Sequence, residues 1–392
     1  EALLGGARAR MKPFAQSVRE LGLEGCYDVI PVPSGYPSPK HVNLVLRRHA
    51  GRTYLFECGP ARPDVVEETL RGLAALGVRR LDALLVTHCH GDHAGSAGIV
   101  AGHGRPVGER APVFLHSAGY RFLTHPDAAF LNETYEIFLT RAHFGLHEFN
   151  SLSDEEMLNN TLRKRFSGYF AKTPKRALSF VDHGKLPPGI LALATPGHSL
   201  DCVLFYDTEL GVAVPGDTMI CTGHVDKPET HAYVIPIITV AGQSYSMPYE
   251  RFLSTVRTLD EFFRRYDVRA VFAPHGKLAI TRPAEWVEFA KGYFRGIFAA
   301  LRDGFFGDAE RRSRAFRAAD LNAFIPSAGS HPISTPSHTF SMLCALADEG
   351  FLSLEEHPHT RQITFLLEEM PPADYVDQRL AEPVSSLPIF GA

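Results

Sequence analysis

The sequence predicts an α/β fold in which strands and helices alternate to build a layered core. Short runs rich in β-branched and aromatic residues, each bounded by turn residues, recur along the chain; TYLFECG at 53–59 and LDALLV at 81–86 are examples. Between them lie segments with apolar residues at helical spacing, such as 62–77, which ends in a glycine that signals a helix C-cap. Alternation of this kind is typical of sheets covered by helices.

The predicted elements follow this order along the first three quarters of the chain. Strand patterns fill much of 27–59, and the strand at 81–86 leads to a helix that begins after residue 94. Residues 117–176 lose strand character and carry helical patterns studded with aromatic residues, which predicts a helical insertion. Strand patterns then return, and two further helices are predicted, at 249–265 and 283–302.

The C-terminal part of the chain predicts a second, smaller domain. Residues 335–350 begin with Thr-Pro and end with Gly, which are helix start and stop signals, and 351–367 alternate apolar and polar residues as a hairpin does. Helices followed by a hairpin describe a winged helix, which we expect over 305–370. The larger domain is then expected over 1–304, and the proline-rich residues 371–392 are expected to form an extended tail.

Composition restricts the class of protein. The 392 residues are 45% hydrophobic and carry a net charge of −4, a balance that is unfavourable for binding a polyanion. The six cysteines show no CxxC pairing, which indicates reduced thiols rather than a disulfide scaffold. No apolar run approaches the roughly 18 residues of a membrane span, and EALLGGARARMK lacks the apolar core of a signal peptide. These features predict a cytoplasmic protein without a membrane partner.

The stretch THCHGDHAG, residues 87–95, concentrates potential metal ligands directly after a predicted buried strand. His88 and His90 are two residues apart, so on an extended segment they point the same way and can grip one ion. Asp92 and His93 lie where the chain turns into a helix and can face a second ion. A chance histidine cluster on a solvated loop is the alternative, but four such residues within six favour metal. Because structural zinc sites are rich in cysteine, a His/Asp set indicates a catalytic site with room for water.

Three later turns have the same character. His198 in TPGH, Asp217 in PGD and His275 in PHG each follow an apolar strand pattern and lie next to glycine. Side chains at the ends of several strands can meet at one edge of a sheet. Together with the first motif they make a set of seven potential ligands.

The order HxHxDH, TPGH, GD and HG resembles the metallo-β-lactamase fold superfamily over about residues 25–300. The resemblance implies a four-layer αββα sandwich with its site at the edge between the sheets. It also implies two divalent metal ions, for which we expect zinc, with iron or manganese as alternatives. Glu57-Cys58-Gly59 departs from the Asp-Thr-Gly common in the family, so the support around the ligands is expected to differ. By the resemblance, the first ion is held by His88, His90 and His198, the second by Asp92, His93 and His275, and both by Asp217, opposite a bridging hydroxide.

Two such ions lower the pKa of a shared water and polarise a scissile bond, so the expected reaction is hydrolysis, with Asp92 as the proton acceptor. TPGHSLD followed by a winged helix resembles the subgroup that includes thioesterases and some endoribonucleases. The aromatic insertion favours a small-molecule thioester or ester of a bulky apolar acyl group, carried free or on a carrier protein or coenzyme A. The acidic hairpin, with Glu355, Glu356, Glu368 and Glu369, is unfavourable for DNA.

Three alternatives stay open. LRKRFSGYFAKTPKR at 162–176 interleaves six basic residues with aromatic ones, a pattern compatible with single-stranded RNA and an endoribonuclease or phosphodiesterase, and equally with a solvated helix face. A lactonase is less favoured, because lactonases of this superfamily carry a tyrosine soon after the bridging aspartate, where this chain has Thr218, Met219 and Ile220. A DNA-reading regulator with the sandwich as sensor is disfavoured by the full ligand set and the acidic hairpin.

Overall fold

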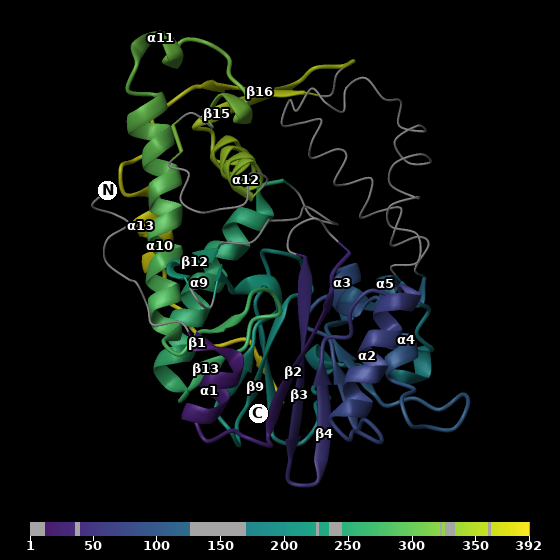
Figure 1. Ribbon diagram of the computed structural model, residues 1–392. Coiled ribbons are helices and arrows are strands. Elements are labelled where there is room, and N and C mark those ends of the chain that lie inside the picture. The colour runs from purple at the N-terminus through teal and green to yellow at the C-terminus, as the bar shows by residue number, and fades with distance from the viewer. Residues whose placement is uncertain are drawn as a thin grey trace.

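Two large β-sheets pack face to face, with helices on their outer faces (Figure 1). The strand order of the first sheet is β2-β3-β4-β5-β6-β7, and that of the second is β13-β10-β9-β8-β17. The computed structural model describes residues 12–35, 40–125, 170–224, 227–234, 245–321, 324–325, 334–359 and 362–391.

The first sheet combines an antiparallel start with a parallel remainder. β2, β3 and β4 form an antiparallel meander, and β4 to β7 run parallel to one another. Parallel neighbours need crossover connections, and these carry the helices of the outer layer. The strands are β2 (Tyr27–Pro33), β3 (His41–His49), β4 (Arg52–Phe56), β5 (Ala83–Leu85), β6 (Val113–Leu115) and β7 (Leu178–Phe180). The helices between them are α2 (Pro63–Ala75), α3 (Gly91–Ala94), α4 (Ala97–Val100) and α5 (Tyr120–Thr124).

The second sheet is antiparallel from β17 to β10, and β13 pairs with β10 in parallel. Its outer face is covered by two long helices, α9 (Met247–Arg265) and α10 (Pro283–Ala299), close to the ranges that the sequence predicts. A π-helical turn, Ala300–Phe305, continues α10. The strands are β8 (Ile190–Ala194), β9 (Val203–Asp207), β10 (Val212–Val214), β13 (Ala270–Val271) and β17 (Ile389–Phe390). Two short strand pairs flank the second sheet. β1 (Lys12–Pro13) pairs with β14 (Leu278–Ala279), with α1 (Phe14–Glu20) beside them, and β11 (Ile220–His224) pairs with β12 (Lys227–Val234).

Side-chain alternation along the strands produces the four layers. In β9, Val203 and Phe205 belong to the core between the two sheets, whereas Leu204 and Tyr206 belong to the core under α9 and α10. Since successive side chains of a strand point to opposite faces, each sheet contributes to two cores. A further core lies between the first sheet and α2 and α4, with Val65 as one of its buried members. The predicted αββα sandwich is confirmed.

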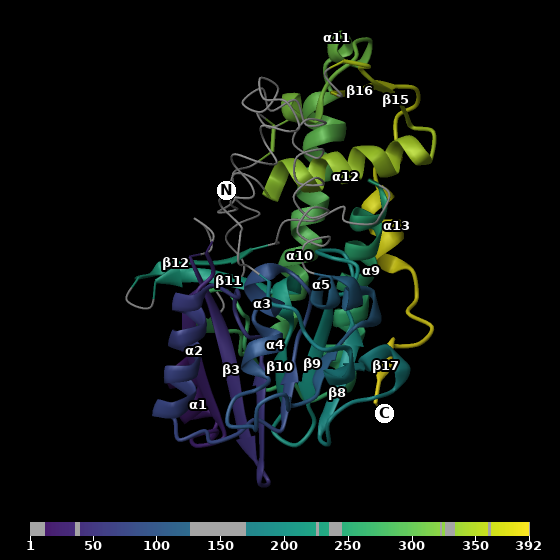
Figure 2. The ribbon, with the colours of Figure 1, turned by 90° about the vertical axis from the view of Figure 1, so that its right-hand side faces the viewer.

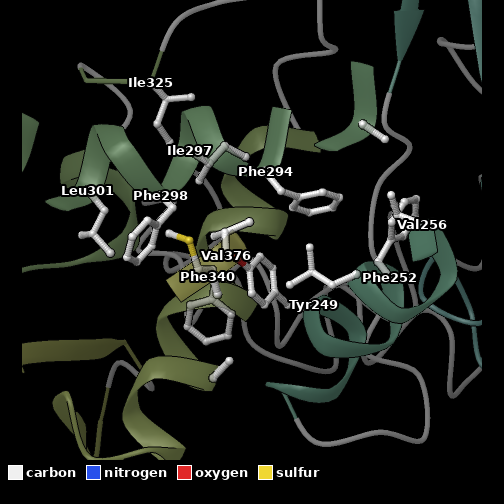
Figure 3. Close-up of a cluster of buried hydrophobic side chains, with 14 of the residues drawn as sticks. Tyr249, Phe252, Val256, Phe294, Ile297, Phe298, Leu301, Ile325, Phe340 and Val376 are labelled. Atoms are coloured by element: carbon white, nitrogen blue, oxygen red, sulfur yellow. The ribbon is translucent and has the colours of Figure 1, made fainter. Parts of the chain in front are cut away.

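The C-terminal region contains the predicted order of helix and hairpin. It consists of α11 (Ala309–Arg312), α12 (Ser334–Asp348), β15 (Leu352–Glu356), β16 (Ile363–Leu367) and α13 (Tyr375–Ala381). α12 lies across the ends of α9 and α10 (Figures 1 and 2). Figure 3 shows Phe340 of α12 and Val376 of α13 packed with Phe294 of α10 and Tyr249 of α9, so this region shares one core with the second sheet's helices. The winged helix stays a prediction.

Two predictions about chain segments need comment. The extended tail over 371–392 is wrong for Tyr375–Ala381, which form α13 because Tyr375 and Val376 bury their side chains, the Tyr375 ring stacking on Phe298 at 5.3 Å. Ile389–Phe390 are extended and pair with β8. Most of the predicted helical insertion, residues 126–169, lies outside the described residues. Among the described helices, none is long and apolar enough to cross a membrane.

A buried ion pair joins the two sheets near the end of β3 and the end of β9. Arg47 of β3 donates through Nε to Asp207 Oδ2 of β9 at 2.5 Å, and neither side chain is exposed. The Tyr27 hydroxyl donates to the same carboxylate oxygen at 2.7 Å. Breaking a buried pair on one side leaves an uncompensated charge, which is strongly destabilising.

We expect Arg47→Ala to lower the free energy of unfolding by about 3–5 kcal/mol, because Asp207 would keep a buried charge without its cation. The matched control is Arg71→Ala, which removes an exposed i,i+4 pair with Glu67 on α2 and should change stability by about 0.5 kcal/mol or less. Urea titration followed by circular dichroism measures both. Equal effects of the two substitutions would contradict a clamping role for Arg47.

Candidate metal centre

The seven predicted ligands converge at one edge of the sandwich, where strands of both sheets end. They form three overlapping groups in which one donor atom from each residue lies within 4.8 Å of the others. In the first sheet they follow β5 and extend into α3, and in the second they follow β8, β10 and β13. The first group is His88 with His90 and His198, and the second is Asp92 with His93 and His275. A third combination, His88 with His93 and Asp217, overlaps both.

The first group places three imidazoles around one point. His90 Nδ1 lies 3.0 Å from His88 Nε2 and 3.0 Å from His198 Nε2. Asp217 approaches this group through Oδ2, which lies 3.7 Å from His198 Nε2. His88 and His198 are buried.

The second group surrounds the other oxygen of Asp217. Oδ1 of Asp217 lies 3.4 Å from His93 Nε2 and 3.4 Å from His275 Nε2. Asp92 closes the group, with Oδ2 3.3 Å from His275 Nε2 and Oδ1 3.6 Å from His93 Nε2. Asp217 therefore lies between the two groups, with one oxygen toward each.

These residues fit divalent metal ions. Ligands about 2.0–2.2 Å from a tetrahedral zinc lie about 3.3–3.6 Å from one another. The spacings of 3.3–3.6 Å around Asp217 Oδ1 and Asp92 match this range, and the nitrogen atoms of the first group lie slightly closer together, at 3.0 Å. Within the described part of the chain, both ring nitrogens of His93 and Oδ1 of Asp217 are buried without a hydrogen-bond partner. Orphaned polar atoms are costly. A cation in the second group would satisfy Nε2 of His93 and Oδ1 of Asp217, whereas Nδ1 of His93 faces Glu57 on the outer side.

The electrostatics of the site also favour a cation. Burial lowers the pKa of His90 to about 4, and it lowers the pKa of His88 as well. Burial also opposes a charged His275, but the carboxylates of Asp217 and Asp92 outweigh it and raise its pKa to about 10. Burial alone would raise the pKa of Asp217, yet His275 and His93 hold it well below its ordinary value. Two buried carboxylates thus draw positive charge to this edge.

Hydrogen bonds on the outer side of the rings select the nitrogen that faces the centre. His275 Nδ1 lies 2.8 Å from the carbonyl oxygen of His41, so it carries the proton and leaves Nε2 toward the carboxylates. His88 Nδ1 lies 3.1 Å from the Thr87 hydroxyl, which itself donates to Glu57. The hydroxyl therefore accepts from His88, whose Nε2 is left toward His90.

Glu57, which departs from the family pattern, supports two of these histidines. Its side chain is fully buried, and its backbone adopts a left-handed conformation with φ of 64°. One oxygen accepts from the Thr87 hydroxyl and lies 3.6 Å from His93 Nδ1, and the other accepts from the Thr87 amide at 3.4 Å. The carboxylate thus faces His93 at ion-pair distance and orients His88 through the Thr87 hydroxyl.

A glycine allows the Asp217 turn to approach this support. Gly216 has φ of 58°, and a Cβ atom there would lie 2.4 Å from the Thr87 hydroxyl oxygen. Any side chain would therefore push the Asp217 turn away from the loop that carries His88. This close approach explains the glycine in PGD, which the sequence alone marks only as a turn.

Two supporting residues are not predicted from the sequence. Asp201 accepts from the backbone amide of Cys89, which lies between two of the predicted ligands. Asn43 of β3 bonds to the loop that carries His275. The position of Asp201 in TPGHSLD, three residues after His198, is a signal that could have found it; Asn43 carries none, because its partners are distant in the sequence.

Known proteins share both the sequence pattern and the fold. The sequence profile of the Metallo-beta-lactamase superfamily matches residues 37–275. A metallo-beta-lactamase family protein from Thermus thermophilus has a similar crystal structure, with a TM-score of 0.59, 22% identity, and coverage of 88% of this chain and 100% of that one. A beta-lactamase domain protein from Burkholderia ambifaria gives a TM-score of 0.61 at 18% identity, covering 87% and 92% of the two chains. No curated protein sequence matches the chain.

The structural likenesses, at these identities, concern the fold. The profile match spans more than half of the chain and includes every residue of the candidate metal centre, from His88 to His275. Members of this superfamily are metal-dependent hydrolases. The chain belongs to the Metallo-beta-lactamase superfamily.

Proposed function

We propose that the protein is a hydrolase with two divalent metal ions that cleaves a thioester or ester of a bulky apolar acyl group. The observation that carries the proposal is the position of Asp217, whose two oxygens face separate groups of ligands. His88, His90 and His198 would hold one ion and Asp92, His93 and His275 the other. We propose zinc as the metal, with iron and manganese as the alternatives to be tested.

Two ions held in this way would lower the pKa of water and polarise the scissile carbonyl. The chain supplies the proton acceptor, for which we propose a carboxylate oxygen of Asp92. Burial alone would raise the pKa of this carboxyl, but His93 and His275 outweigh it and lower the pKa, so the group is ionised and able to accept. Asp92 is itself buried, which limits the contact of the acceptor with bulk water.

The described ends of the insertion support the choice of an apolar substrate. The amide of Ala171 donates to Gly95 at 2.7 Å, directly after α3, and the amide of Thr173 donates to Leu123 of α5 at 2.8 Å. The aromatic-rich insertion therefore ends beside α3, the helix that carries Asp92 and His93. Leu200, two residues after His198, adds a large apolar side chain that is 36% exposed.

The charge of the hairpin argues for a small-molecule partner rather than a nucleic acid. Glu355 and Glu356 of β15 and Glu368 and Glu369 after β16 are exposed, which is unfavourable for phosphate. The substrate is proposed to be free or linked to coenzyme A or a carrier protein, with no DNA or membrane partner.

One observation favours a second candidate, an endoribonuclease. Lys175 lies over the Tyr120 ring, with Nζ 5.6 Å from its centre, at the root of the insertion. Lys172 and Arg176 lie on the same short segment. Basic residues next to an aromatic ring can hold single-stranded RNA, so RNA belongs in the substrate test.

Metal content tests the two-ion assignment. Purified protein loaded with zinc should bind close to two equivalents, measured by elemental analysis after gel filtration. Asp217→Ala should lower the occupancy of both sites, because each loses one carboxylate oxygen. Asp64→Ala is the control, since this exposed acidic residue pairs with Arg62 at the start of α2, away from the centre. One equivalent in the native protein, unchanged by Asp217→Ala, would contradict the model of a shared ligand.

A hydrolysis screen tests the reaction. At equal enzyme concentration, thioesters and esters of bulky apolar acyl groups should be cleaved faster than lactones, phosphodiesters or single-stranded RNA. Asp92→Ala should lower kcat by on the order of 10²-fold or more, with a smaller effect on KM, since it removes both a ligand and the proton acceptor. Faster cleavage of RNA than of every acyl substrate, abolished by Asp92→Ala, would favour the nuclease instead.

The support from Glu57 can be measured separately from catalysis. We expect Glu57→Gln to weaken zinc binding by about 10- to 100-fold, because it removes the charge that faces His93 and that orients His88 through Thr87. Competition with a chromogenic chelator gives the affinities. Glu67→Gln on the exposed face of α2 is the control, and an affinity in Glu57→Gln equal to that of the control would refute the orienting role.

A further inference from the structure

Each group of ligands takes side chains from both sheets. The first joins His88 and His90, which follow β5, to His198, which follows β8. The second joins Asp92 and His93 to His275, which follows β13. The shape of either group therefore depends on how two loops are fixed to one another across the sheet interface.

Asp201 fixes the two loops of the first group. Its carboxylate is buried; Oδ2 accepts from the backbone amide of Cys89 at 2.8 Å, and Oδ1 accepts from the Ser199 hydroxyl at 2.7 Å. Cys89 lies between His88 and His90, and Ser199 follows His198. One carboxylate thus joins the loops that carry all three imidazoles.

The packing around Asp201 leaves little freedom. A Cβ atom on Gly119 would lie 2.7 Å from Asp201 Oδ2 and 2.4 Å from Cys89 Sγ, so the backbone of the 117–119 turn closes over this contact. The amide of Val203 also donates to the Thr87 carbonyl at 2.8 Å, which ties β9 to the same loop. The carboxylate is held in one place by both sheets.

Asn43 does the same for the loop of the second group. Its amide nitrogen donates to the carbonyl oxygens of Gly276 at 2.6 Å and Ala273 at 3.3 Å, and its backbone amide donates to Pro274 at 2.6 Å. These carbonyls flank His275 on both sides. Since Asn43 lies on β3 of the first sheet, it fixes the His275 loop across the interface.

We propose that Asp201 and Asn43 are positioning residues, each for one metal ion: Asp201 for the ion of His88, His90 and His198, and Asn43 for the ion of Asp92, His93 and His275. The proposal rests on the two-ion function proposed above. Partners one step removed from a metal ligand are each worth about 10- to 100-fold in metal affinity. Because the two residues support different loops, their losses should fall on different ions.

Stepwise zinc titration against a chelator, which yields two dissociation constants, tests this assignment. In the His198→Ala background, where the second group holds the remaining ion, Asn43→Ala should weaken binding by about 10- to 100-fold, and Asp201→Ala should change it by about twofold or less. In the His275→Ala background, where the first group holds the remaining ion, Asp201→Ala should cause the large loss and Asn43→Ala the small one. Circular dichroism of each metal-free variant checks that it folds.

Conservative variants separate positioning from general destabilisation. Asp201→Asn should restore part of the affinity, because an amide oxygen can still accept from Cys89. Asn43→Asp should not, because it replaces the donors to Gly276 and Ala273 by acceptors. Ser199→Ala, which removes one arm of the Asp201 contact, should give an intermediate loss at the first ion.

The outcomes distinguish this proposal from the proposed function. A native protein that binds fewer than two zinc ions contradicts the two-ion function. A native protein that binds two, with both substitutions weakening both ions equally or neither ion, contradicts the positioning roles and leaves the two-ion function standing.

Discussion

The contact between the two sheets is the constraint on which the centre depends. Phe56 of β4 packs on Phe205 of β9 with ring centres 6.0 Å apart, and Phe272 fills the same core. Every group of ligands spans this contact, so the apolar interface sets the separation of donor atoms that belong to different sheets. At one end the sheets are joined by Arg47 and Asp207, and at the other by the loops of the centre itself.

Much of the architecture and the location of the centre could be predicted from the sequence. Turns rich in potential ligands come together when the strands that they follow end at one edge of a sandwich. The motifs HxHxDH, TPGH, GD and HG therefore predict which seven residues meet at the centre. Strand alternation likewise predicts the layers, since Val203 and Leu204 must face opposite cores. These features are predictable because side-chain alternation and turn formation depend on residues that are neighbours in the sequence.

The sequence does not show which residues bond to one another when they are far apart along the chain. Asn43 looks like one polar position in a strand, and only the approach of Ala273 and Gly276 gives its amide a role. Glu57 could be recognised as a departure from Asp, but not as a carboxylate that serves both Thr87 and His93. The prolines of the tail predict an extended segment, whereas burial of Tyr375 against Phe298 outweighs that local preference in α13.

The short strand β17 has a consequence for how the protein behaves in solution. It pairs with β8 at Leu193 and Ala192, and the Ala194 amide donates to Pro388 at 3.0 Å (Figure 2). Without it, β8 would present a row of unpaired amides and carbonyls, the kind of edge that recruits strands from other molecules. Ile389 and Phe390 therefore cover an edge that could otherwise pair with another molecule. The strand that they cover, β8, leads directly to His198. The pairing of these two residues thus covers the edge of a strand that leads into one of the loops of the candidate metal centre.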